Sequence, residues 1–142
     1  MIESSSTTQP RWRRWLQSAA ALLVGMVAVV ALSIGTDAIL HGLKVFPPDD
    51  QPMDAPALNL LALAYRSLYG VVGSWIAARL APAAAMGHAL ALGVIGLLLS
   101  LTGVVITWKM GLGPHWYPIA LVATALPLAW LGGAIQRAGR RP

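Results

Sequence analysis

An arginine stands in the middle of a long apolar stretch, where a charged side chain is least expected. Arg66 lies in LALAYRSLYGVVGSWIAARLAP, directly after Tyr65 and three residues before Tyr69. An ionised arginine inside a bilayer is costly, and it is tolerated when it faces a helix bundle or a water-filled cavity and has a partner. The sequence therefore points to a polar site inside an apolar protein, in which Arg66 meets an anionic group.

Asp37 is the best anionic partner in the chain, because it is the only carboxylate that adjoins an apolar run. At a rise of 1.5 Å per residue, Asp37 lies roughly 33 Å above Trp15 and Arg66 roughly 20 Å above Arg79, a difference in depth of roughly 13 Å. Side chains tilt toward the N-terminus of their own helix, which turns Asp37 and Arg66 toward each other. The sequence leaves open whether the two pair, directly or through one water molecule.

Helical spacing places further polar residues on the side of the helix that Arg66 occupies. Asn59 and Tyr69 fall on its side of the helix at steps of seven and three residues. His41 follows Asp37 by four residues, so the two share a helix face if the first helix extends that far. We expect a polar, outward-facing notch that binds a ligand through Asp37, Asn59, Tyr65, Arg66, Tyr69 and His41. The alternative is that Asp37 and Arg66 form only a structural pair that fixes one geometry of the bundle.

Metal and nucleophilic chemistry have weaker support. Asp37, His41 and His115 would suit zinc or iron if they converged, but the chain has no HxxxH or HExxH pattern. His88 and His41 are expected on opposite sides of the membrane, so they are not expected to hold a haem together. The apolar runs also lack a nucleophile-elbow pattern and a pair of carboxylates. We therefore predict no catalytic residue, no metal and no cofactor.

The composition indicates what surrounds these polar residues. Of the 142 residues, 57% are hydrophobic and 11% are charged, whereas roughly a quarter are charged in soluble domains. Four runs each reach the roughly 20 residues that a helix needs to cross a bilayer. We expect an all-α, four-transmembrane-helix bundle, with Pro82 in the first turn of its third helix. The expected helices are 15–42, 57–80, 83–108 and 116–136, with a disordered tail at 1–14 and a basic tail at 137–142.

The basic residues predict how the chain is threaded. Seven arginines fall on one side if the chain crosses four times, while Lys44, Lys109 and most of the aspartates fall on the other. The positive-inside rule then places both termini in the cytoplasm, in a bacterial cytoplasmic membrane. The net charge of +5 accordingly reflects membrane topology rather than nucleic-acid binding. A cleaved secretory signal is the alternative for the N-terminus, but its apolar run is longer than such signals usually have.

Small residues indicate where the helices pack. Rows of glycine, alanine and serine at helical spacing let helix backbones approach closely in lipid. We expect such packing at Gly70, Gly73, Ser74, Gly93 and Gly96. Because four helices enclose little space, we expect a homo-oligomer or a place in a larger membrane complex, surrounded by the lipid bilayer.

Four stretches carry a resemblance to known proteins: GTDAILH (35–41), AYRSLYG (64–70), ARLAP (78–82) and WYPIALVATALP (116–127). They resemble a group of small bacterial inner-membrane proteins that have no assigned activity. The resemblance implies four helices and an inner-membrane location, and it transfers no catalytic residue. Three functions stay open: a ligand-binding or transport-related protein, a non-catalytic accessory subunit of a larger membrane complex, and, with least support, an intramembrane enzyme.

Overall fold

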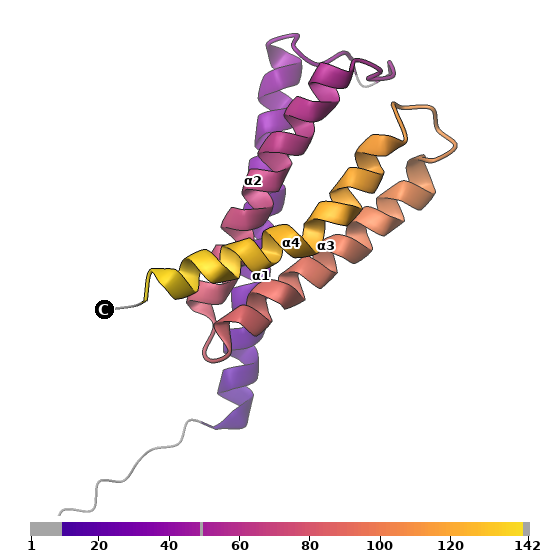
Figure 1. Cartoon of the computed structure of the whole chain (residues 1–142). Helices are drawn as coiled ribbons and strands as arrows, with labels where there is room; N and C mark the ends of the chain where they lie inside the picture. Colours follow the sequence, from indigo (N-terminus) through magenta and orange to yellow (C-terminus); the bar gives the residue numbers. More distant parts are fainter. Residues whose placement is uncertain (1–9, 49, 141–142) are drawn as a thin grey trace, which may run out of the picture.

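The computed structural model describes residues 10–48 and 50–140, which form four helices joined by short connections (Figure 1). The helices are α1 (Arg11–Gly42), α2 (Pro56–Leu80), α3 (Ala85–Thr107) and α4 (Trp116–Ala138). Each is long and apolar enough to cross a membrane. The expected all-α class with four such helices is confirmed, and four candidate spans point to a multi-pass membrane protein.

The helices form two hairpins, α1–α2 and α3–α4, which spread apart at one end (Figure 1). The connections 43–55 and 108–115 lie at this end, which we call the loop end. The start of α1, the link 81–84 and the end of α4 lie toward the opposite end. We call it the arginine-rich end, because it holds Arg11, Arg13, Arg14, Arg79, Arg137 and Arg140.

Small side chains fill the interior of the bundle, and large apolar side chains face outward. The most deeply buried apolar side chains are alanines, none more than 1% exposed, whereas Leu98 is 57% and Val105 is 76% exposed. Small residues allow helices to approach closely, and an apolar outer surface matches a lipid environment. The alanines are Ala21, Ala62, Ala77, Ala78, Ala89 and Ala129.

Two glycines bring α1 and α2 into direct backbone contact. A Cβ atom added to Gly25 would lie 2.7 Å from the carbonyl oxygen of Gly73. A Cβ atom added to Gly73 would lie 2.8 Å from the carbonyl oxygen of Gly25 and would overlap the side chain of Val29. The two helices therefore cross at these positions with no room for a larger residue.

The other expected packing positions differ from one another. A Cβ atom at Gly93 would lie 2.5 Å from the Cβ of Ala129, which places α3 tightly against α4. Ser74 is 2% exposed, and its Cβ would lie 2.8 Å from a Cβ added to Gly132 of α4. Gly70 makes only ordinary contacts, and a Cβ at Gly96 would meet open space. Close packing thus depends on particular glycines rather than on every small residue.

Two helix starts differ from the expected boundaries by two residues or more. α1 begins at Arg11 rather than at residue 15, so residues 11–14 are helical instead of belonging to a tail. Residues 1–9 of that expected tail lie outside the described residues. α3 begins at Ala85, and Pro82 lies in the preceding link rather than in the first turn. The chain turns sharply here because Ala84 has a left-handed backbone, with φ of 48°.

Pro127 lies in the middle of α4, and Figure 1 shows this helix bending partway along its length. A proline inside a helix removes one backbone hydrogen bond and crowds the preceding turn, which bends the helix. α4 packs against both α3 and α2. The bend therefore lets one helix follow two neighbours that diverge toward the loop end.

Candidate functional site

A polar cluster joins α1 to α2 on the loop-end side of their glycine crossing. Nη2 of Arg66 donates a hydrogen bond of 2.6 Å to Oδ2 of Asp37, forming an ion pair. The hydroxyl of Tyr65 donates to the other carboxylate oxygen of Asp37. One position earlier in α1, the hydroxyl of Thr36 lies 2.7 Å from the hydroxyl of Tyr69. The Arg66 cation is therefore held beside a carboxylate that is itself positioned by hydrogen bonds.

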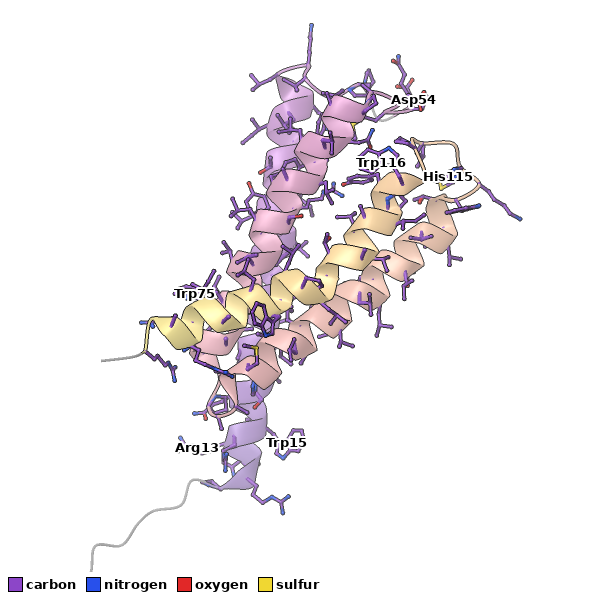
Figure 2. The ribbon with its side chains drawn as sticks, in the orientation of Figure 1. Arg13, Trp15, Asp54, Trp75, His115 and Trp116 are labelled. Atoms are coloured by element: carbon purple, nitrogen blue, oxygen red, sulfur yellow. The ribbon has the colours of Figure 1, made fainter. Side chains whose placement is uncertain are left out.

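The glycine crossing explains why Asp37 and Arg66 can pair. With Gly25 and Gly73 as a common level, Asp37 lies about 18 Å and Arg66 about 10 Å farther toward the loop end. The backbones differ in depth by only about 8 Å, and the two side chains lean toward each other across this gap. The larger sequence-based estimate took Trp15 as level with Arg79. Figure 2 shows Trp15 beyond the α2–α3 link, on the part of α1 that projects from the bundle.

Arg66 stands between two hollows in the bundle. The central hollow has a volume of about 370 Å³ and is lined by all four helices, mostly through aliphatic side chains and glycines, with seven polar residues that include Asp37 and Arg66. The loop-end hollow has a volume of about 420 Å³ and is lined by α2, α3, α4 and both loop-end connections. Arg66, Leu99, Ser100 and Leu121 line both hollows. The arginine thus forms part of the boundary between the two hollows.

The ion pair does not satisfy all the donors near Arg66. The side chain of Arg66 is 34% exposed, and that of Asp37 is 27% exposed. Nε of Arg66 and the hydroxyl of Tyr117 are buried, and neither has a hydrogen-bond partner among the described residues. Tyr117 lies close enough to Arg66 to interact with its charge and lines the loop-end hollow with it. A carboxylate or phosphate could accept from both groups.

Two of the expected ligand-binding residues, Asn59 and His41, make hydrogen bonds to the backbone near them. Asn59 is 2% exposed, and its Nδ2 donates to the carbonyl oxygens of Met53 and Ala55 at 2.7 and 3.1 Å. It therefore fastens the α1–α2 connection beside the loop-end hollow, whose wall it helps to form. His41 donates from Nδ1 to the carbonyl oxygen of Asp37 at 2.8 Å. Its ring packs edge-on against Phe46, at the end of α1.

The histidines do not converge on a common point with Asp37. Among residues 10–48 and 50–140, no three histidine, cysteine, aspartate or glutamate side chains lie close enough together to hold a metal ion. His115 donates to the carbonyl oxygen of Trp108 at 3.1 Å and packs against its ring. His88 donates to the carbonyl oxygen of Ala84 at 3.2 Å. Both rings have backbone partners near helix ends.

Tyr117 is the residue of the site that the sequence does not reveal. Its place beside Trp116 suggests only an aromatic anchor at the membrane surface. Its buried hydroxyl lies near Arg66 because α4 packs against α2, and no spacing in the sequence encodes that contact.

Comparisons with known protein families, with curated proteins and with solved structures found no match. The geometry around Arg66 is therefore the basis on which a function can be argued. That geometry is an ion pair between helices, two adjoining hollows, and buried donors without partners among the described residues.

Proposed function

We propose that this chain is a small multi-pass membrane protein that binds an anionic ligand at Arg66, in a ligand-binding or transport-related role. The observation that carries the proposal is the guanidinium between two hollows, with a buried Nε and a neighbouring Tyr117 hydroxyl that have no partners among the described residues. An arginine offers five N–H donors in a fixed planar fork, which suits a carboxylate or phosphate. Among the described residues, Asp37 accepts from Nη2 of this fork, and Nε has no acceptor.

Asp37 gives the site a built-in competitor for the arginine. When no ligand is bound, the carboxylate compensates the charge of Arg66 within the membrane. A second anion brought to the same guanidinium is attracted by Arg66 and repelled by Asp37. Removal of the Asp37 charge should therefore tighten binding, whereas removal of the Arg66 charge should abolish it.

A bacterial cytoplasmic membrane with both termini inside is the location we propose. All six arginines described outside the bundle interior lie at the arginine-rich end, where both described chain ends also lie. The positive-inside rule favours that end in the cytoplasm. The resemblance to small bacterial membrane proteins supports the same location. On this orientation the loop-end hollow faces the outer side of the membrane, and we propose that several copies of the chain assemble around such sites.

Native mass spectrometry of the tagged full chain, purified from its host in mild detergent, tests the proposal. We expect a homo-oligomer that carries a small bound anion, and we expect this mass to be lost in Arg66→Gln and retained or increased in Asp37→Asn. Arg79→Gln is the matched control, because it removes an arginine from the same helix outside both hollows.

Two results would contradict the proposal. One is a small bound mass that persists in Arg66→Gln. The other is a stoichiometric larger protein partner without any small ligand, which would favour the accessory-subunit function.

A further inference from the structure

A second basic hollow lies at the arginine-rich end, far along the bundle from Arg66. It has a volume of about 410 Å³ and lies between the first turn of α3 and the end of α4. Its walls include Ala85, Met86 and Gly87 of α3 and Gln136, Arg137 and Arg140 of α4. None of these residues belongs to either hollow beside Arg66. We call it the α3–α4 hollow.

Close packing between α3 and α4 brings these residues together. A Cβ atom added to Gly133 would lie 2.7 Å from Sδ of Met86 and 2.9 Å from the Cβ of Ala89. The end of α4 is therefore pressed against the first two turns of α3. Gln136 and Arg140 follow Gly133 by three and seven residues, so they lie on the same side of α4.

The polar groups of the hollow are chiefly donors, and several of them lack acceptors. The first N–H groups of any helix have no acceptor within the helix, and no side chain caps the start of α3. Gln136 is only 3% exposed, yet its Nε2 has no hydrogen-bond partner among the described residues. The hollow therefore combines the positive end of a helix dipole with uncapped N–H groups and a buried amide. Such a combination suits an anion whose oxygens accept hydrogen bonds.

The charges described around the hollow are all positive. Arg137 and Arg140 are exposed at its edge, and Nη2 of Arg140 donates to the carbonyl oxygen of Arg79 at 3.4 Å, at the end of α2. The described carboxylates, Asp37, Asp50 and Asp54, belong to the other half of the bundle. No described carboxylate at this end therefore competes for the arginines, in contrast to the situation at Arg66.

The position of the hollow fits the headgroup layer of a membrane. It lies where α3 begins and α4 ends, and both are candidate spans. A neighbouring hollow of about 290 Å³ shares Ala84 with it and is lined by Arg11, Arg14 and Trp15. Basic pockets between membrane helices bind anionic headgroups, and exposed tryptophans mark the same layer.

We propose that the α3–α4 hollow binds the phosphate group of an anionic phospholipid. Arg137 and Arg140 attract the phosphate, the first N–H groups of α3 donate hydrogen bonds to its oxygens at the helix N-terminus, and the Gln136 amide donates to another of its oxygens. The acyl chains of the lipid lie against the apolar outer surface of α3 and α4. This site is independent of the ligand proposed at Arg66.

Native mass spectrometry of the detergent-purified full chain, titrated with phosphatidylglycerol or with zwitterionic phosphatidylcholine, measures the lipid affinity. We expect phosphatidylglycerol to bind more tightly, and we expect Arg137→Gln/Arg140→Gln to weaken its binding by roughly 30-fold, from the usual contribution of two basic residues near headgroups. Arg11→Gln/Arg14→Gln is the matched control, because it removes the same charge from the neighbouring hollow. We expect this control to change the affinity less than about threefold, since its arginines do not touch the bound phosphate.

Two further variants separate binding from folding. Arg137→Lys/Arg140→Lys keeps the charge and should keep most of the affinity. Gln136→Leu should weaken binding roughly tenfold through the loss of a hydrogen bond to a charged group, while thermal unfolding followed by circular dichroism stays unchanged or moves upward. A merely structural Gln136 would show the opposite pattern, with lower stability and unchanged lipid affinity.

Three results would overturn the proposal. Equal losses in the two double-glutamine variants would mean that diffuse charge, not this hollow, attracts the lipid. Both lipids carry a phosphate, so equal affinity for them would show that the hollow does not select a lipid with a net negative charge. Displacement of phosphatidylglycerol by inorganic phosphate at similar concentration would assign the site to a soluble phosphate instead of a lipid.

Discussion

A double-mutant cycle on Asp37 and Arg66 should show strong coupling between the two residues. A fully buried ion pair that loses one partner destabilises a protein by about 3–5 kcal/mol. The side chains here are 27% and 34% exposed, so we scale this loss to about 2–3 kcal/mol for Asp37→Asn and for Arg66→Gln alone. The double variant leaves no unpaired charge, so we expect it to be about as stable as either single variant. The coupling energy is then about 2 kcal/mol, which is at the upper end of the interaction energies measured for polar contacts between membrane helices.

Unfolding in mixed detergent micelles with increasing dodecyl sulfate, followed by circular dichroism, gives the four free energies of the cycle. Tyr69→Phe is a useful control, because it removes the neighbouring bond to Thr36 without touching a charge. We expect it to cost about 1 kcal/mol and to add to either charge variant independently. If the losses of Asp37→Asn and Arg66→Gln simply add, the ion pair does not hold α1 to α2, and the reasoning about this site fails.

Two further predictions concern packing and salt. Gly73→Ala should destabilise the chain by about 1–3 kcal/mol, because the added Cβ would meet the backbone of Gly25. The Cβ added in Gly96→Ala would meet open space. This variant should change stability by less than about 0.5 kcal/mol in the same unfolding assay. Raising the salt concentration from about 0.05 to 0.5 M should weaken lipid binding at the α3–α4 hollow more than it changes the Asp37–Arg66 coupling, because salt screens exposed charges much more than partly buried pairs. Equal salt sensitivity at both places would show that Arg66 is as solvated as Arg137.

The number and type of the helices follow from the sequence, because runs of apolar residues long enough to cross a bilayer leave few alternatives. Their ends are harder to predict. Pro82 reads as a helix start, but the left-handed turn at Ala84 delays α3 until Ala85. Helix propensity alone cannot predict such a turn, since alanine rarely adopts this backbone.

The site is predictable only in part, for a similar reason. Arg66 is conspicuous because a cation in an apolar run needs an explanation, and Asp37 is the natural partner by charge. Their contact depends on where α1 crosses α2, and Gly25, which sets that crossing with Gly73, is one glycine among many in the sequence. Asn59 shares the helical face of Arg66, but its side chain donates to backbone carbonyl oxygens in the α1–α2 connection. Spacing along one helix shows which residues share a face, and only the packing of several helices shows what that face meets.

The position of the ion pair favours a role beyond holding two helices together. α1 and α2 already meet through the backbone contact at Gly25 and Gly73, and a neutral hydrogen bond between Thr36 and Tyr69 joins them again near the pair. A buried ion pair adds little net stability, because two charges must be removed from water to form it. A purely structural contact would also be expected within the packed crossing, whereas Arg66 lines two hollows and remains about one-third exposed. A partly exposed cation that lines two hollows, with its charge compensated by a carboxylate, agrees with the binding role proposed above.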